Sequence, residues 1–72
     1  MPVHVFRGDR LRSIREASGK PREAVALAIG RSVSTIAGYE AERLTPDAKM
    51  VAALAAELGV HPGDFFGETV AA

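Results

Sequence analysis

The side chains that could perform chemistry are few in this sequence, and they do not form a catalytic set. There is no cysteine, which excludes disulfides and thiolate metal ligands. The two histidines, His4 and His61, each stand without a second ligand at metal spacing, whereas zinc needs about three or four convergent ligands. No nucleophile lies near a base, no carboxylates pair on one face, and no glycine-rich loop is placed to hold a phosphate. We therefore expect no enzyme activity, no metal and no cofactor.

The charged side chains are distributed unevenly along the chain, although its net charge is zero. Residues 1–39 carry seven basic and three acidic residues, a net charge of +4, and residues 40–72 carry two basic and six acidic residues, a net charge of −4. A localised basic face is the usual electrostatic signature of a DNA-binding protein. Ordinary clustering of charges on a solvated surface would produce the same asymmetry, so both interpretations stay open at this point.

The length and composition limit the architecture that can position these residues. A chain of 72 residues holds one domain with a small core, and such domains often depend on a disulfide, a metal or a partner subunit. With the first two not expected, helix packing and self-association are the expected sources of stability. No apolar run reaches the ~18 residues of a membrane helix, and the first residues do not resemble a secretion signal. We expect a cytoplasmic protein without a membrane segment.

The apolar spacing predicts a compact all-α domain over residues 8–67, with residues 1–7 as an N-terminal extension and residues 68–72 as a loose C-terminal tail. Apolar residues recur at helical spacing, and N-cap residues, prolines and glycines mark the boundaries between the helices. The alternation of two valines near the start is too short to predict a strand. The helices are expected to begin near Gly8, Pro21, Ser32, Thr45 and Asp64.

The most informative spacing lies between the second and third predicted helices. Ala26 precedes Gly30 by four residues, and Ile36 follows Gly30 by six. A small side chain at Ala26 lets two helices approach closely, Gly30 supplies a positive φ in the turn, and Ile36 fills the space between the helices. This is the spacing of a helix-turn-helix, in which the second helix enters the major groove of DNA. Alone, the spacing also occurs by chance.

A longer match extends on both sides of this spacing. The segments LRSIREASGKPREAVALAIGRSVSTIAGYEAERLTP and VAALAAELGVHPGDFF resemble the Cro/repressor-type (XRE-like) helix-turn-helix family, in register over Leu11–Phe66. The resemblance implies a compact lambda-repressor-like domain of five helices, with residues 33–41 as the recognition helix. It also implies a repressor-like, sequence-specific regulator of transcription that binds double-stranded DNA as a homodimer on a palindromic operator.

The resemblance further implies an ion pair inside the domain. In this family an arginine of the first helix commonly bridges a glutamate at the end of the third, and the matching positions are Arg15 and Glu40. The sequence offers an independent reason, because Glu40 follows Ile36 by four residues and lies at the edge of a buried face, where a carboxylate needs a partner. A solvated surface glutamate is the alternative.

Contacts with bases are expected from the start of the third helix, where Ser32 is the predicted N-cap. A hydroxyl of Ser34 or Thr35 can hydrogen-bond a base or a phosphate, and Val33 can contact a thymine methyl group. Members of the family usually read bases with Arg, Lys, Gln or Asn, which this helix lacks, so we expect a larger share of the specificity from DNA shape and backbone contacts. Ser34 as a purely local cap ligand is the alternative. The residues expected to face bases or the groove are Ser32, Val33, Ser34, Thr35, Ala37 and Gly38.

Arginines beside the same two helices are the expected phosphate contacts. Arg22 opens the second helix, where the family often has a phosphate-binding glutamine. Arg31 lies in the turn, Arg43 follows the third helix, and the helix N-termini add oriented N–H donors. Each of these arginines can equally be a solvated surface residue.

One departure from the family pattern and a few apolar residues leave further alternatives open. Glu42 stands where the family usually has glycine, so either the third helix continues through it or its backbone is strained. Leu27 and Leu44 are apolar residues at positions expected to face solvent. An antitoxin or adaptor that uses the same fold to bind another protein, through these leucines or through Phe65 and Phe66, is the alternative function.

Overall fold

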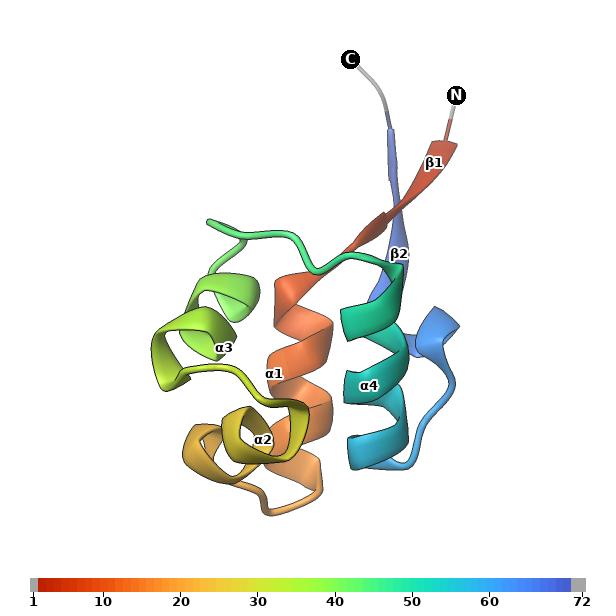
Figure 1. Ribbon diagram of the computed structural model, residues 1–72. Coiled ribbons are helices and arrows are strands. Elements are labelled where there is room, and N and C mark those ends of the chain that lie inside the picture. The colour runs from red at the N-terminus through yellow and green to blue at the C-terminus, as the bar shows by residue number, and fades with distance from the viewer. Residues whose placement is uncertain (1, 71–72) are drawn as a thin grey trace.

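Figure 1 shows the computed structural model, which describes residues 2–70. α1 contacts α3, and α2 contacts both α3 and α4, so the helices surround one core. The 3₁₀ helix η1 closes the space between α1 and α4. In chain order, the elements are β1 (Pro2–Phe6), α1 (Gly8–Ala17), α2 (Arg22–Ile29), α3 (Val33–Glu40), α4 (Ala48–Leu58), η1 (Pro62–Phe65) and β2 (Phe66–Val70).

The architecture is helical as predicted, but it does not have five α-helices. Residues 2–70 form four α-helices, and the predicted last helix is a single short 3₁₀ turn, η1. The expectation that the chain has no strand is also wrong, because β1 and β2 pair as a two-stranded antiparallel ribbon with Phe6 opposite Phe66 and Val3 opposite Thr69. Residues 2–6, which were expected to be an N-terminal extension, therefore pair with residues 66–70, which include the start of the expected loose tail.

Side-chain caps mark the starts of α3 and α4, and one of these two starts differs from the prediction. Ser32 begins α3 as predicted, because its Oγ accepts a hydrogen bond from the N–H of Thr35. The predicted start of the fourth helix at Thr45 is wrong. Asp47 is the N-cap instead, and its Oδ1 accepts the N–H of Met50 at 2.9 Å. Both threonine and aspartate are good N-caps, and the aspartate lies after the proline rather than before it.

The core is made of the apolar stripes of the four helices and one aromatic ring from η1. Its largest fully buried side chains are at 0% exposure, and each contributes roughly 1.5–3 kcal/mol by leaving water. The same cluster also contains Ala26, Tyr39, Val51, Ala55 and Leu58. The fully buried set is Leu11, Val25, Ile36, Leu54 and Phe65.

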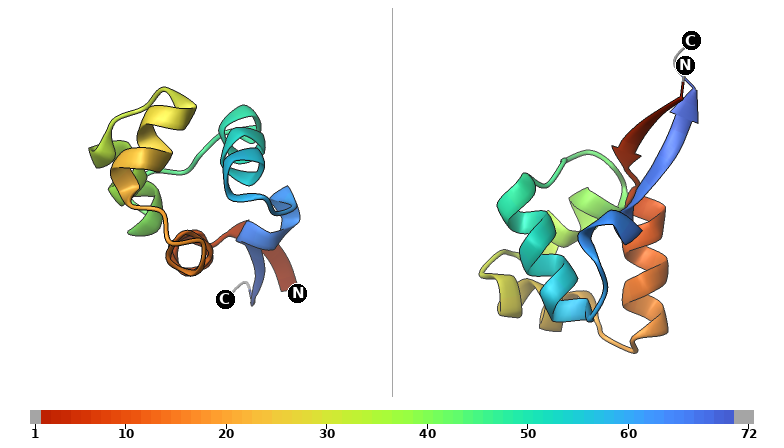
Figure 2. Two further views of the ribbon diagram at one scale, coloured as in Figure 1. Left: turned by 90° about the horizontal axis from the view of Figure 1, so that it is seen from below. Right: turned by 90° about the vertical axis from the view of Figure 1, so that its right-hand side faces the viewer.

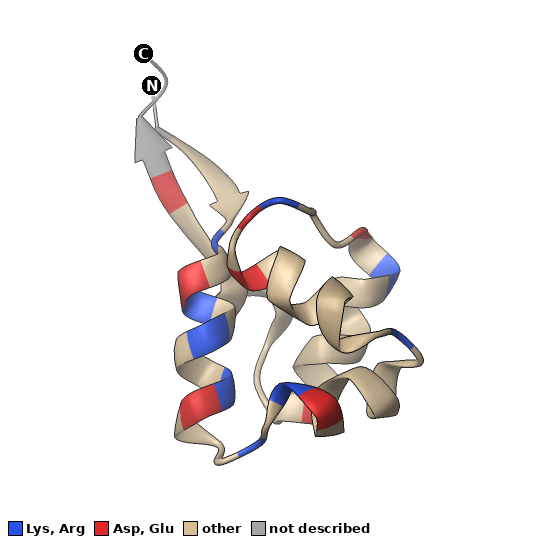
Figure 3. Cartoon of the chain, turned by 90° about the vertical axis from the view of Figure 1, so that its left-hand side faces the viewer, with Lys and Arg blue, Asp and Glu red and all other residues tan. Residues whose placement is uncertain are grey.

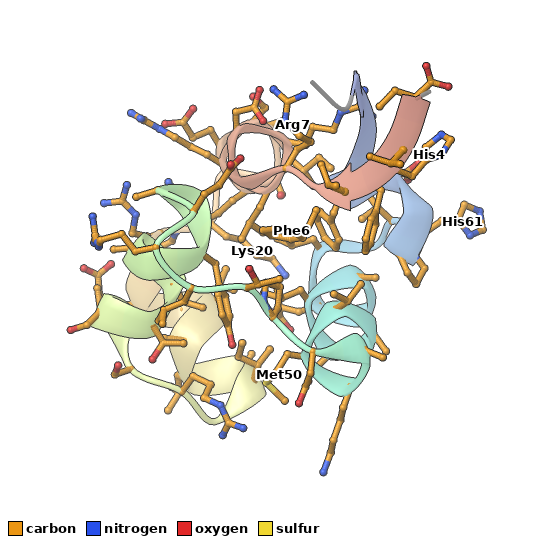
Figure 4. All side chains as sticks on the ribbon, turned by 90° about the horizontal axis from the view of Figure 1, so that it is seen from above. His4, Phe6, Arg7, Lys20, Met50 and His61 are labelled. Atoms are coloured by element: carbon orange, nitrogen blue, oxygen red, sulfur yellow. The ribbon has the colours of Figure 1, made fainter. Side chains whose placement is uncertain are left out.

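The strand pair extends away from the helices (Figure 2). A cluster of aromatic side chains anchors it to the core. The ring of Phe6, at the end of β1, lies 6.5 Å from the ring of Tyr39, 6.3 Å from that of Phe65 and 6.2 Å from that of Phe66, measured between centroids. Figure 4 shows Phe6 directed into the body of the molecule, whereas the labelled His4 and His61 point outward. Within the described residues, no helix has the length and apolar character needed to cross a membrane.

Candidate nucleic-acid interface

The segment from α2 to α3 forms two helices joined by a tight turn. Gly30 ends α2 in the left-handed conformation, with φ of 69°, and the N–H of Arg31 returns to the carbonyl of Ala26 at 2.9 Å. Only glycine adopts this φ without a steric cost. Ala26 is buried at 3% exposure and Ile36 at 0%, so the small residue and the space-filling residue both lie at the contact between the helices.

Three hydroxyl groups lie at the start of α3, on Ser32, Ser34 and Thr35, and two of them already make local hydrogen bonds. The Oγ of Ser32 accepts the N–H of Thr35 at 3.2 Å and lies 3.0 Å from the Oγ1 of Thr35. Ser32 remains exposed, and Thr35 is half-buried. The hydroxyl of Ser34 makes no hydrogen bond within the described residues, and its side chain is exposed. Of the three hydroxyls, that of Ser34 is therefore the one available to a ligand.

The outward side of α3 is a narrow stripe of small side chains. Val33 is 39% exposed, Ser34 is exposed, and Ala37 is half-buried on the next turn. Ile36 and Tyr39 point to the opposite side and are buried in the core. The helical period of about 3.6 residues aligns positions 33, 34, 37 and 41 along one side, and we call Val33, Ser34, Ala37 and Ala41 the α3 stripe.

Gly38 does not share this exposed side, so the expectation that it faces the groove is wrong. It is buried, and a Cβ built on it would lie 2.8 Å from the Cδ1 of Leu44. Leu44 thus folds back over the end of α3 and remains 49% exposed. The expectation that Leu44 faces solvent is half right, because its inner side covers Gly38.

Glu40, at the end of α3, is held by two arginines from two other helices. The Nε of Arg15 donates to its Oε2, the Nη2 of Arg15 donates to its Oε1 at 3.3 Å, and the Nε of Arg22 donates to Oε1 at 2.9 Å. The side chains of Arg15 and Glu40 are 9% and 3% exposed, so this pair is excluded from solvent as the resemblance implied, whereas that of Arg22 is 38% exposed.

The electrostatics of this cluster favour the ionised carboxylate. Burial alone would raise the pKa of Glu40, but the hydrogen bonds from Arg15 and Arg22 outweigh it and hold the pKa below its ordinary value. The hydrogen bond to Glu40 likewise raises the pKa of Arg15. Sequence reasoning missed that Arg22 joins the pair, because the contact joins residues 18 positions apart and no helical spacing predicts it.

Arg31 and Arg43, the other two predicted phosphate contacts, lie at the two ends of α3. Both are exposed, and neither has an acidic partner among residues 2–70. Arg31 turns one guanidinium N–H to the carbonyl of Gly30 at 3.1 Å. Figure 3 shows α3 nearly free of charged residues, with basic residues in the chain on either side of it.

Most of the other basic side chains are neutralised locally. Three are paired with carboxylates within 4 Å, namely Arg7 with Asp9, Arg12 with Glu16, and Lys20 with Glu57. Lys20, labelled in Figure 4, donates from its Nζ to the backbone carbonyl of Glu57 at 2.8 Å and to the Oε2 of Glu57 at 2.9 Å. The positive charge without acidic partners in the described residues is on Arg10, Arg31, Arg43 and Lys49, two of which adjoin α3.

Glu42 resolves the alternative left open for the segment after α3. Its φ of 62° is in the left-handed region, so of the two alternatives the helix does not continue and the backbone is strained. Its Oε2 accepts the first N–H of α1, from Gly8, at 2.8 Å. Gly8 itself packs against the end of α3, where a Cβ would overlap the carbonyl oxygen of Glu40. Glu42 thus joins the loop after α3 to the start of α1.

The fold and this site are those of a helix-turn-helix protein. Residues 11–65 match the family model described as helix-turn-helix. The crystal structure of the restriction-modification controller protein C.AhdI from Aeromonas hydrophila is similar, with a TM-score of 0.78 and 30% identity over 82% of this chain and 89% of that chain. No curated protein matches the sequence significantly. The chain belongs to the XRE-type helix-turn-helix family of DNA-binding transcription regulators.

Proposed function

We propose that this chain regulates transcription in a repressor-like manner, binding as a homodimer to a palindromic operator with α3 in the major groove. The observation that carries the proposal is the α3 stripe, an exposed and uncharged helix side with Arg31 at one end and Arg43 at the other. The likeness to a restriction-modification controller protein supports a role in controlling gene expression.

The dimensions and chemistry of the α3 stripe suit the major groove of DNA. A helix with its side chains is about 10–12 Å across, and the major groove is about 12 Å wide. Small side chains at Val33, Ser34 and Ala37 let the helix backbone approach the base edges closely. The start of α3 also presents unpaired N–H groups, which favour a phosphate.

Three arginines are the proposed phosphate contacts, and they differ in whether a carboxylate already binds them. Arg31 and Arg43 are free of acidic partners in residues 2–70 and supply full charges to the DNA backbone. Arg22 donates its Nε to Glu40, while its side chain stays 38% exposed, so its outer guanidinium nitrogens remain available to a phosphate. In this role Glu40 orients Arg22 and thereby fixes the position of the contact.

A homodimer explains how so small a basic surface would bind with useful affinity. Each neutralised phosphate contributes a salt-dependent term, and a second subunit doubles the number of contacts on a two-fold site. Half-sites would lie about 34 Å apart, one turn of DNA, so that both copies of α3 enter the groove from the same side.

Selection of binding sites from random DNA, followed by salt titration on the enriched site, tests this function. We expect a palindromic motif, and we expect Arg31→Ala and Arg43→Ala each to reduce the slope of log K against log salt by about one unit for each phosphate that the variant no longer neutralises. Arg12→Ala is the matched control, because it removes the same charge from α1, where Arg12 is paired with Glu16. No enriched motif, or equal slopes for all three variants, would refute the proposal.

The antitoxin or adaptor remains the second candidate, and one observation favours it. Leu27 on α2 is 84% exposed, and a partner protein that covered it would remove this apolar side chain from water. An isolated exposed leucine is common on protein surfaces, so this observation is weaker than the arginine arrangement. In the selection experiment, a failure to enrich any DNA motif together with a flat salt response would favour this candidate.

A further inference from the structure

We propose that the α3 stripe recognises thymine through its 5-methyl group, so that methyl contacts, rather than long hydrogen-bonding side chains, supply the direct part of sequence recognition. This inference rests on the proposed function and specifies the ligand of the same site. It predicts operators whose half-sites place thymine methyl groups against Val33 and Ala37.

The chemistry of the α3 stripe is almost entirely that of methyl groups. Val33 contributes two methyls and is 39% exposed, while Ala37 and Ala41 contribute one each, Ala41 from an exposed position and Ala37 from a half-buried one. No amide, guanidinium or ammonium group lies on this side of the helix, whose sequence is VSTIAGYE. The surface offers dispersion and exclusion of water rather than donors and acceptors.

Hydrogen bonding from the same stripe is limited to one group. The hydroxyls of Ser32 and Thr35 lie 3.0 Å apart, and the first of them accepts the N–H that caps the helix. Gly38 carries no side chain and is covered by Leu44. That leaves the hydroxyl of Ser34, which can meet a donor or an acceptor and so discriminates poorly between bases.

The arginines beside α3 are not placed to hydrogen-bond base edges, so they do not replace the long polar side chains that this helix lacks. Arg31 directs a guanidinium N–H to the carbonyl of Gly30, which turns its head toward the turn instead of along α3. Arg43 comes three residues after the last residue of α3, beyond the end of the stripe. Arg22 is committed through its Nε to Glu40. These placements suit the DNA backbone on either side of the groove.

The bases present one apolar group to such a surface. In the major groove each base pair displays hydrogen-bonding atoms, and thymine alone adds a methyl group. If Val33 lay against the amino group of cytosine or the O6 of guanine, a polar atom would lose water without gaining a partner, which is unfavourable. The stripe therefore selects thymine both by attraction to its methyl and by rejection of the other edges.

Modified bases isolate the methyl group from the rest of thymine. On the selected site, replacing a contacted thymine by uracil removes only the methyl, and we expect binding to weaken about fourfold for each methyl removed. Replacing the same pair by C·G and then by 5-methylcytosine·G adds the methyl back on a different hydrogen-bonding edge, and we expect the methylated site to bind about fourfold more tightly than the unmethylated one.

Two variants assign the effect to this helix. Val33→Ala should reduce the uracil penalty at the contacted position, whereas Ser34→Ala should leave that penalty unchanged, because it removes no methyl contact. Equal affinity for thymine and uracil at every position, or a selected half-site without thymine, would overturn the methyl readout while leaving DNA binding intact. A chain that binds no DNA in the selection would overturn the proposed function itself.

Discussion

Glu40 links three helices through one carboxylate. It accepts hydrogen bonds from Arg15 of α1 and Arg22 of α2 while it ends α3, and only 3% of its side chain is exposed. A buried charge of this kind costs free energy to desolvate and is stable only while its partners remain. The same cluster therefore sets both the packing of α3 and the position of Arg22. Of the three candidate phosphate contacts, Arg22 is the one that also belongs to an ion pair inside the domain.

Glu40→Ala should lower the free energy of unfolding by ~3–5 kcal/mol, because it leaves Arg15 buried and without a counter-charge. Urea denaturation measures the change. Glu16→Ala is the matched control, since Glu16 pairs with Arg12 on the surface and such pairs contribute about 1 kcal/mol or less. Equal unfolding free energies for wild type and Glu40→Ala would show that the cluster contributes no stability.

Glu40 also makes the free energy of unfolding depend on pH in the acidic range. Because the pKa of Glu40 is lowered in the folded state from an ordinary value of 4.5, the stability it contributes is fully present above that pH and is lost as pH falls through the folded pKa. The difference in unfolding free energy between wild type and Glu40→Gln should therefore be constant at neutral pH and shrink in acid. Denaturation at a series of pH values tests this, and a difference that grows on acidification would contradict it.

At the scale of elements, the sequence predicted the helices well because the signals for them are local. Apolar residues at helical spacing, the N-cap Ser32 and the glycine after α2 depend on neighbours a few positions away. The start of α4 was misplaced by two residues because two good N-cap residues flank Pro46 and only packing selects between them. The placement of Gly38 was also missed, because Leu44 covers it through a loop whose path no periodicity encodes.

The loop between α3 and α4 combines strain with a compensating hydrogen bond at Glu42. Glu42→Ala keeps the positive φ and loses the bond to the N–H of Gly8, so we expect a loss of about 1 kcal/mol, the usual contribution of a cap. Glu42→Gly loses the same bond but relieves the backbone, which recovers about 1–2 kcal/mol. Thermal denaturation should therefore rank the glycine variant above the alanine variant, and the reverse order would mean that the backbone is unstrained.

At the scale of the whole molecule, the strand pair is the feature that the sequence did not reveal. Its two strands lie at opposite ends of the chain, so their pairing is a long-range event, and five residues with a single Val-His-Val alternation carry little signal. An isolated two-stranded ribbon is marginal in water, which makes the aromatic contacts of Phe6 important for holding it. The ribbon thus fastens the segments Pro2–Phe6 and Phe66–Val70 to the core that supports α3.

Phe6→Ala should destabilise the protein by about 3 kcal/mol, since it empties a site between Tyr39, Phe65 and Phe66. Val5→Ala, one residue earlier in the same strand and 37% exposed, is the matched control and should change stability by about 1 kcal/mol or less. Chemical denaturation compares the two. Similar effects of both substitutions would indicate that the ribbon is not anchored through its aromatic residue.

The central claim is that the outward side of α3 and the arginines beside it form the DNA-binding surface. Titration of the ¹⁵N-labelled protein with its selected DNA site, followed by amide chemical shifts, tests that claim most directly. We predict that the largest changes fall within residues 31–43, with small changes in the strands and η1. Changes concentrated on the strand pair, or none on α3, would contradict it.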